Sequence, residues 1–287
     1  MLPFRKILFP VDYSEPCQAV VPYVKDMMRH FSAELTLVHA YGPAAAFIDS
    51  GIGITDPSLR EKVQTSQEQR LEKFAREMFP GEHSESIAEL GEPGSVVDRA
   101  AQRQGADLIM LATRGHGPLR RFLLGSVTAK VLHDLSTAVW TGVGSALTGH
   151  TPQIPYMSIL CAIDSSNESE GVLRAAAALA CSYQAQLSIL HVVETPVPSP
   201  EVDFGPIKKQ LIDAAHFSLR ELKGKVGAEA PHTVLDTTVS EGLREEALRR
   251  KADLVVTGRG HSQAALGRMW SHLYPMVREA PCPVLSI

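Results

Sequence analysis

The segment most suited to bind a ligand runs from Ala112 to Thr128 and reads ATRGHGPLRRFLLGSVT. Gly115 and Gly117 carry no side chain, so the backbone can approach a ligand closely there. Gly125 and Ser126 stand directly before an apolar run that is typical of a helix start, where exposed N–H groups and the positive end of the helix dipole favour a phosphate. The Ser126 hydroxyl can add one more hydrogen bond. The spacing therefore indicates a site for a phosphate-bearing anion.

Three arginines add positive charge to this segment. Arg114, Arg120 and Arg121 lie close enough in sequence to reach outer phosphates, although Arg120 and Arg121 equally fit a solvated helix face. The segment is not a Walker loop, because no G-x-x-x-x-G-K-[ST] occurs in the chain, and no G-x-G-x-x-G opens the first helix. General motif rules alone leave two interpretations open, a phosphate loop and a simple glycine-rich turn.

The elements that would position this segment alternate between short apolar runs and longer amphipathic runs. The apolar runs suit strands that are buried on both faces, and the periodic runs suit helices. Ser14 and Ser166 precede the first helix of each half and are expected to cap it. Alternation of this kind predicts doubly wound α/β domains with parallel sheets. The predicted strands are 7–11, 35–39, 86–90, 107–112, 139–143, 159–163, 187–192, 233–239, 253–257 and 284–287, and the predicted helices include 16–31, 58–78, 94–104, 168–183, 208–226 and 243–251.

The second half of the chain repeats the first. Residues 5–41 and 157–193 align without a gap, so that Asp12 matches Asp164 and His39 matches His191, in each case 152 positions further on. A repeat of this length is a duplicated domain and not a solenoid unit of about 20–50 residues. The stretch GVGSALTGHTPQIP has the composition of a linker. We therefore expect domains at 1–144 and 156–287, joined by a linker at 145–155, each with a five-stranded parallel sheet flanked by helices.

The bulk composition excludes several classes of protein. The chain has 287 residues, a formal net charge of −4, 44% hydrophobic residues and 21% charged residues, which is typical of a globular protein. This charge balance does not favour a nucleic-acid surface, and no run of about 18 apolar residues predicts a membrane span. The four cysteines form no C-x-x-C pair and fit core residues in a reducing compartment. We therefore expect a cytoplasmic protein that binds neither nucleic acid nor membranes.

The glycine spacing also carries a family resemblance that covers essentially the whole chain. The pattern Ala112-x2-Gly115-x9-Gly125-Ser126 resembles the fingerprint G-x2-G-x9-G-[ST] of universal stress proteins, with Ala112 as its one departure. An aspartate that closes the first strand, here Asp12, belongs to the same pattern. The resemblance implies a Rossmann-like domain of the adenine nucleotide alpha hydrolase type. It also implies binding of ATP, or of ADP or AMP, with or without Mg²⁺.

The resemblance assigns positions to the parts of the nucleotide. It places adenine near Asp12 and the backbone of Ala40, and it places ribose and phosphates along 112–115 and 125–127. The nucleotide-binding residues implied in this way are Pro10, Val11, Asp12, Ala40, Ala112, Arg114, Gly115, Gly125, Ser126 and Val127.

The second copy departs further from the fingerprint. It reads Gly258-Arg259-Gly260, one residue shorter between the glycines, and Trp270-Ser271 follows where Gly-Ser is expected. A tryptophan in place of a phosphate-loop glycine should crowd the anion site, although Gly267 is nearby. We therefore expect domain 1 to bind nucleotide and domain 2 to bind it weakly or not at all. The degenerate second site would consist of Asp164, Gly258, Gly260 and Ser271.

Several of these side chains also have a structural interpretation. Asp12 could contact the nucleotide, or it could cap the helix that follows. His39 and His191 fit packed structural histidines better than metal ligands or proton carriers, because no cluster with ligand spacing accompanies them. His116 and His261 fit solvated loop residues as well as phosphate contacts.

No nucleophilic pair can be argued from the spacing. Ser126 is expected to be a ligand and not a nucleophile, and Asp12 is the only candidate base, so we expect at most weak ATPase activity. The leading hypothesis is a nucleotide-responsive stress regulator that unknown protein partners recognise. A slow ATP-hydrolysing or adenylyl-transferring enzyme of the same fold stays open, and so does a partner-binding scaffold that has lost its nucleotide. The resemblance also implies that strand 139–143 pairs with strand 284–287 within one chain, and a homodimer of such chains is compatible with it.

Overall fold

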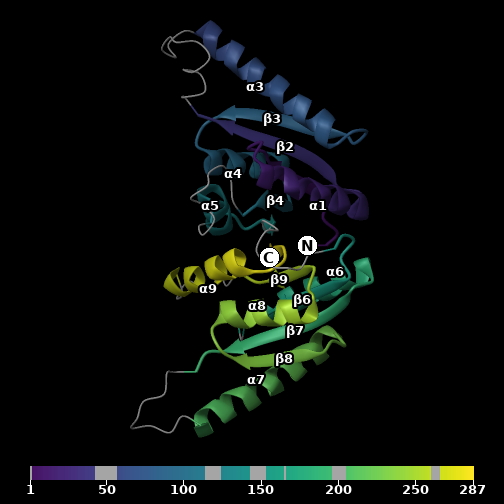
Figure 1. Ribbon diagram of the computed structural model, residues 1–287, viewed down its shortest axis with the longest axis vertical. Helices are drawn as coiled ribbons and strands as arrows, with labels where there is room; N and C mark the ends of the chain where they lie inside the picture. Colours follow the sequence, from purple (N-terminus) through teal and green to yellow (C-terminus); the bar gives the residue numbers. More distant parts are fainter. Residues whose placement is uncertain are drawn as a thin grey trace. The chain divides into compact units, whose positions relative to one another are not determined.

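The computed structural model describes residues 2–42, 57–113, 124–142, 153–164, 166–195, 205–259 and 266–287, with the backbone alone for 57–59 and 266–272 (Figure 1). It divides into two compact units, Pro3–Gly144 and Ser145–Ile287. Each unit is a parallel sheet with helices packed against it, which is the expected α/β architecture. The predicted linker lies largely outside the described residues.

The first unit has five strands in the order β3-β2-β1-β4-β5, all parallel. This order reverses direction at β1 and β4, which is the switch point where ligands bind in open α/β sheets. Its strands are β1 Lys6–Pro10, β2 Glu34–Tyr41, β3 Ser84–Leu90, β4 Leu108–Ala112 and β5 Ala138–Gly142, and its helices are α1 Glu15–Phe31, α3 Pro57–Met78, α4 Pro93–Gln104 and α5 Ser126–Asp134.

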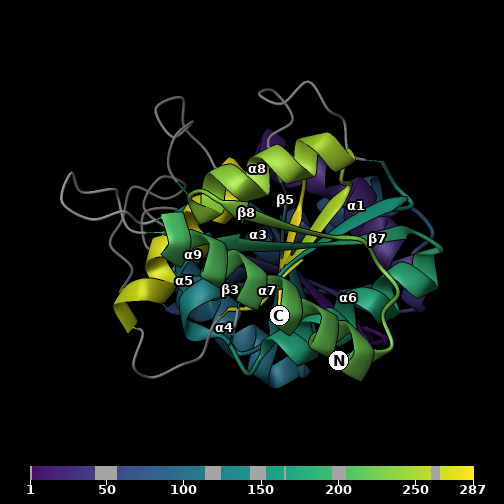
Figure 2. The same ribbon diagram turned by 90° about the horizontal axis from the view of Figure 1, so that it is seen from below.

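The second unit repeats this order as β8-β7-β6-β9-β10. α6 packs against α7, and α8 packs against α9, so that helices cover both faces of the sheet (Figure 2). Its strands are β6 Ser158–Ala162, β7 Gln186–Val193, β8 His232–Asp236, β9 Leu254–Thr257 and β10 Val284–Ser286, and its helices are α6 Ser169–Tyr183, α7 Gly205–Val226, α8 Val239–Arg250 and α9 Leu266–Glu279.

Strand register confirms that the two units are copies. Ile7 pairs with Leu35 and with Leu108, and Ile159 pairs with Leu187 and Leu254 in the same way. The central strands of both sheets are buried runs of mostly aliphatic residues, as expected for parallel strands covered on both faces. Because the registers match, Ala112 at the end of β4 corresponds to Gly258, and Thr113 corresponds to Arg259.

Three local predictions for the second unit were wrong. Ser166 does not cap α6: the helix begins at Ser169, its N-cap position is Glu168, and the Ser169 N–H donates to the Ser166 carbonyl across a turn. β8 ends at Asp236 and not at 239, because the Thr238 hydroxyl accepts from the Glu241 N–H and starts α8 there. α8 therefore begins four residues before the predicted start.

No helix in the described ranges is both long enough and apolar enough to cross a membrane.

Candidate functional site

The loop after β1 is built around Asp12. Its Oδ1 atom accepts the Ser14 N–H at 2.9 Å and the Ser14 hydroxyl at 2.6 Å. Ser14 in turn caps α1, because its hydroxyl accepts the Cys17 N–H at 3.2 Å, which satisfies a donor that the helix leaves open. Ser14 is therefore the cap that the sequence predicts, and Asp12 holds the cap in place. The half-buried Asp12 carboxylate lies at the carboxyl end of β1.

Tyr13 completes this loop in an uncommon backbone conformation. Its φ of 62° lies in the left-handed region, which is unfavourable for a residue with a Cβ and is tolerated when surrounding contacts fix it. The Tyr13 ring packs 4.7 Å from His39 and 5.5 Å from Phe74, and the Arg70 guanidinium lies 4.1 Å from its centroid. Burial raises the pKa of Tyr13 to about 12. These contacts hold the Asp12 loop against β2 and α3.

His39 ties the end of β2 to the same loop. Its Nδ1 atom lies 2.7 Å from the Val11 carbonyl oxygen, and burial lowers its pKa, so that the imidazole is neutral near pH 7. A neutral ring can donate its Nδ1–H to that carbonyl. His191 makes the same contact with Ile163 at 2.9 Å. Among the described residues, no group of three metal-ligating side chains occurs, and both histidines act as structural contacts.

The loop between β4 and α5 is closed at its base by Thr113. The Thr113 N–H and hydroxyl both donate to the Gly142 carbonyl, at 3.0 and 2.8 Å. The Gly125 N–H donates to the Thr113 carbonyl at 2.9 Å, and the Thr128 hydroxyl donates to the Ala112 carbonyl at 3.0 Å. These four bonds fix the start of α5 against the carboxyl ends of β4 and β5.

The start of α5 differs from the starts of α1 and α4. The side chains of Ser14 and Glu92 cap α1 and α4, whereas no described side chain caps α5, whose N-cap residue is Gly125. The N–H groups of Ser126 and Val127 belong to the first helical turn and have no partner within the helix. They lie beside the switch point of the sheet. Their N–H donors and the positive end of the helix dipole together suit an anion.

The second unit keeps the aspartate loop. Asp164 accepts the Ser166 N–H at 2.9 Å and the Ser169 hydroxyl at 2.9 Å. Burial alone would raise the pKa of Asp164, but the hydrogen bonds from Ser166 and Ser169 outweigh it and lower the pKa. The carboxylate is thus used by its own loop in this copy as well.

The second unit differs from the first at the positions that correspond to Thr113, Gly125 and Ser126. Arg259 takes the place of Thr113 and is 3% exposed, with its Nη2 atom 3.3 Å from the Ser286 carbonyl. Burial lowers the pKa of Arg259 to about 10. α9 begins at Leu266, so Trp270 and Ser271 lie inside a helix, whereas Gly125 and Ser126 stand at the start of one. The backbone N–H of Ser271 is therefore directed along a helix and not toward a loop.

Pro10, Val11, Asp12, Ala40 and Ala112 lie at the carboxyl ends of β1, β2 and β4, and Gly125, Ser126 and Val127 form the facing helix start. Their binding roles stay predictions. Gly258 follows β9, close to Val172 of α6. The predicted residues Arg114, Gly115 and Gly260 lie outside the described residues, as do His116, Gly117, Arg120, Arg121 and His261.

Comparison with known proteins settles the family. The model of the universal stress protein family matches residues 3–141 and 155–287. The chain belongs to this family. It contains two universal stress protein domains, called domain 1 and domain 2 below.

Some of the similar proteins match about half of this chain, and others match nearly all of it. A universal stress protein of Thermus aquaticus is 29% identical over 131 residues, which are 46% of this chain and 93% of the relative. A universal stress protein from Archaeoglobus fulgidus is 20% identical, with a TM-score of 0.66 over 98% of this chain and 95% of that one, which shows the shared fold. A universal stress protein crystallised in complex with cAMP is 21% identical over 48% of this chain and 95% of its own, with a TM-score of 0.33.

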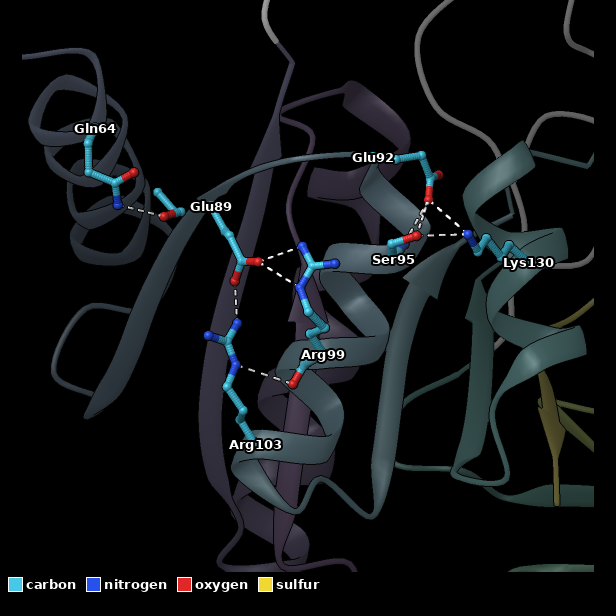
Figure 3. Close-up of polar contacts among 8 residues, drawn as sticks. Gln64, Glu89, Glu92, Ser95, Arg99, Arg103 and Lys130 are labelled. Atoms are coloured by element: carbon cyan, nitrogen blue, oxygen red, sulfur yellow. Dashed lines mark hydrogen bonds and ion pairs between the residues drawn. The ribbon is translucent and has the colours of Figure 1, made fainter. Parts of the chain in front are cut away.

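Domain 1 of this universal stress protein also has a polar rim that sequence reasoning missed (Figure 3). Glu92 caps α4 and accepts the Lys130 ammonium of α5 at 2.9 Å, and the Ser95 hydroxyl lies 2.9 Å from the same nitrogen. Because helix side chains lean toward the N-terminus, Lys130 carries its charge back toward the start of α5. Glu89 pairs with Arg99 and Arg103 further along α4. No spacing in the sequence predicts the Glu92–Lys130 pair, because its two residues are 38 positions apart in the chain.

Proposed function

We propose that domain 1 binds an adenine nucleotide at the carboxyl ends of β1 and β4. The observation that carries this proposal is the uncapped start of α5, fixed beside the switch point by Thr113 and preceded by the family's glycine fingerprint. The N–H groups of Ser126 and Val127, together with the Ser126 hydroxyl, would bind phosphate oxygens. ATP, ADP and AMP all fit this chemistry, and any Mg²⁺ would be held mainly by the phosphates.

The base and ribose would lie across the ends of β1 and β2. Val11 and Ala40 offer backbone groups at the two strand ends, and the Asp12 carboxylate lies between the first strand and α1. The fixed geometry of the Asp12 loop means that this part of the site is formed before the ligand arrives. A preformed site lowers the entropy lost on binding.

Regulation fits this site better than efficient catalysis. Water activation needs a base within hydrogen-bond reach of the attacked phosphate, and Oδ1 of Asp12 is already bonded twice to Ser14. We therefore propose that nucleotide occupancy changes a surface that protein partners recognise. The sequence prediction that ATP orders the loop Arg114–Gly125 concerns a segment of which only Leu124 and Gly125 are among the described residues. The hypothesis requires different hydrogen-exchange protection of this segment with and without ATP; equal protection would contradict it.

Domain 2 is proposed to bind nucleotide weakly or not at all. The guanidinium of Arg259 is buried where domain 1 has the hydroxyl of Thr113. α9 begins at Leu266, before Trp270 and Ser271, which are the residues expected at the phosphate. Both changes remove the open helix start that carries the proposal for domain 1.

The test is nucleotide stoichiometry. Mass spectrometry of small molecules released from purified protein, with calorimetric titration of ATP–Mg²⁺, should give one adenine nucleotide per chain. Gly125→Trp, which gives domain 1 the residue of domain 2, should abolish binding, whereas the control Gly260→Trp should not. Two equal sites would refute the assignment to domain 1, and no binding would refute the proposed function. Pairing of the two final strands, a homodimer and a cytoplasmic location stay predictions from the sequence.

A further inference from the structure

Two histidines meet at the edge of the domain 2 sheet. His216 lies on α7, and His232 begins β8, the edge strand against which α7 packs (Figure 1). The Nδ1 atom of His216 lies 3.1 Å from Nε2 of His232, and the two ring centroids are 5.3 Å apart. One ring therefore donates an N–H to the lone pair of the other.

The distance between these two nitrogens is close to that of two ligands on one zinc ion. Zn–N bonds of about 2.0–2.1 Å that span the 3.1 Å between His216 and His232 enclose an angle of about 98° at the metal. The ideal tetrahedral angle of about 109° needs a separation of about 3.3 Å. The pair is thus within a few tenths of an ångström of that geometry, and a rotation of each ring would turn both lone pairs to one point.

Metal binding requires no net loss of protons from the neutral pair. If Nδ1 of His216 is the donor, its proton moves to Nε2 of the same ring, and if Nε2 of His232 is the donor, its proton moves to Nδ1. Either shift leaves two neutral imidazoles with facing lone pairs, the form that binds metals. Burial lowers the pKa of His232, and the positive charges of Lys223, His216 and Arg220 lower it further, so this ring is neutral near pH 7.

The surroundings of the pair indicate a weak, exchangeable site. Both rings are partly exposed, so water can complete the coordination. Within the part of the chain that the structure describes, no third histidine, cysteine or carboxylate joins them, whereas permanent zinc sites have three or four protein ligands. The positive charges of Lys223 and Arg220 reach His232 and oppose a divalent ion.

Domain 1 has neither histidine at the matching place. Ser86 takes the register position of His232, because it pairs with Leu37 as His232 pairs with Ile189. Glu68 takes the position of His216, since α3 and α7 are both 22 residues long and each of these residues is the twelfth of its helix. The pair is therefore a feature of domain 2.

The edge that the pair joins is thinly packed. Along its 22 residues α7 buries Ala215 and Leu219, and every residue of β8 is partly exposed. The matching helix of domain 1 buries Val63, Gln67, Leu71, Phe74 and Ala75. An ion bound to both histidines would link α7 to β8, and it would stabilise domain 2 as the free ion concentration exceeds the dissociation constant.

We propose that His216 and His232 together bind a divalent transition-metal ion of the Zn²⁺ type, with water in the remaining positions. The bound ion clamps α7 to β8, so that domain 2 responds to metal. Mg²⁺ does not replace it, because Mg²⁺ prefers oxygen ligands. The site is independent of the nucleotide site proposed for domain 1.

The test uses the full chain, freed of metal with EDTA and free of nucleotide. Calorimetric titration with Zn²⁺ should give one site per chain that involves this pair, and Zn²⁺ should raise the melting temperature, whereas Mg²⁺ should do neither. His216→Ala and His232→Ser, the second of which supplies the residue of domain 1, each leave one imidazole. Since losing a group that merely orients a metal ligand typically costs about 10–100-fold in affinity, each variant should bind Zn²⁺ at least tenfold more weakly.

Controls separate this site from other histidines and from misfolding. The exposed His83, just before β3, is the matched control, and His83→Ala should keep wild-type affinity. Melting in EDTA shows that each variant is folded. Electron paramagnetic resonance with Cu²⁺, which binds such ligands more tightly, should show two nitrogen ligands in the wild type and one in each single variant.

The outcomes are distinct from those of the nucleotide test. Gly125→Trp, which should abolish nucleotide binding in domain 1, should leave Zn²⁺ binding unchanged. The absence of Zn²⁺ binding, or binding that survives both His216→Ala and His232→Ser, would refute the metal site whatever the nucleotide result.

Discussion

Gly142 is the position where a single methyl group should test the packing around the proposed nucleotide site. It ends β5, and its carbonyl accepts both hydrogen bonds from Thr113. A Cβ at this position would lie 2.8 Å from Val20 Cγ2 and 2.9 Å from Trp140 Cζ3. Both distances are shorter than carbon atoms tolerate. Gly142→Ala must therefore move the strand end, α1 or the indole ring.

The structure indicates how large the cost should be. Trp140 is fully buried, with its ring centroid 5.0 Å from that of Tyr23 and the two rings tilted by 40°, and Val20 is 3% exposed on the packed face of α1. Neither neighbour is the free end of a flexible chain, so we expect the upper part of the overpacking range, about 2–3 kcal/mol. The lower unfolded-state entropy of alanine offsets only about 0.4–1 kcal/mol of this. The net loss should lower the melting temperature of domain 1 by roughly 3–10 °C.

The chain offers a clean assay for this change. It has two tryptophans, Trp140 in domain 1 and Trp270 in domain 2, so a Trp270→Phe background makes fluorescence report domain 1 alone. Gly171→Ala is the control: it lies inside α6 with nothing within 4 Å of an added Cβ, and alanine should stabilise the helix by about 0.5–1 kcal/mol. If Gly142→Ala unfolds with wild-type stability, the contacts yield freely and the argument for a fixed loop base is wrong.

Three further predictions concern polar contacts. Ser14→Ala removes the cap on the Cys17 N–H and should cost about 1 kcal/mol in urea unfolding; no loss would show that Ser14 is dispensable. Hydrogen bonds from Ser95, Lys130 and the Gly94 N–H lower the pKa of Glu92 from 4.5 to about 2. Its contribution is therefore present above pH 4.5 and is lost as the pH falls toward 2. Glu92→Gln should flatten the pH dependence of stability in that window, and an unchanged slope would contradict the assignment. Glu246→Ala removes a carboxylate that is 1% exposed and leaves Thr233 without its acceptor, so thermal melts should show a loss of about 1–3 kcal/mol, and wild-type stability would disprove this role.

Much of the fold could be predicted because its signals are local. The first strand was expected at 7–11 and is found at Lys6–Pro10, and α4 begins one residue before its predicted start. Apolar runs and duplicated spacing are visible without knowing any distant contact. Ser166 misled the prediction because a serine after an aspartate looks the same whether the helix begins at once or one turn later. Only the bond from the Ser169 hydroxyl to Asp164 distinguishes the two cases.

The site was predictable only in part, for a related reason. The glycine spacing pointed to the helix start at Ser126, which the structure places at the carboxyl end of the sheet. Thr113 and Thr128, which hold that helix start, occupy positions that the fingerprint leaves unspecified. Their acceptors are carbonyls of Gly142 and Ala112, and the first of these lies on a strand 29 residues away. Contacts between residues so far apart in the sequence form only once the sheet is assembled, so no local spacing in the sequence indicates them.

The paired aspartate loops give the molecule a built-in reference. Asp12 and Asp164 hold equivalent loops in the two domains, while the uncapped start of α5 lies beside the switch point of the first domain. A spectroscopic change that appears at both loops when nucleotide is added would reflect a difference in temperature, ionic strength or crowding. A change at the first loop alone reports occupancy. Recording the two signals from one chain would therefore separate ligand effects from bulk effects within a single sample, at any protein concentration.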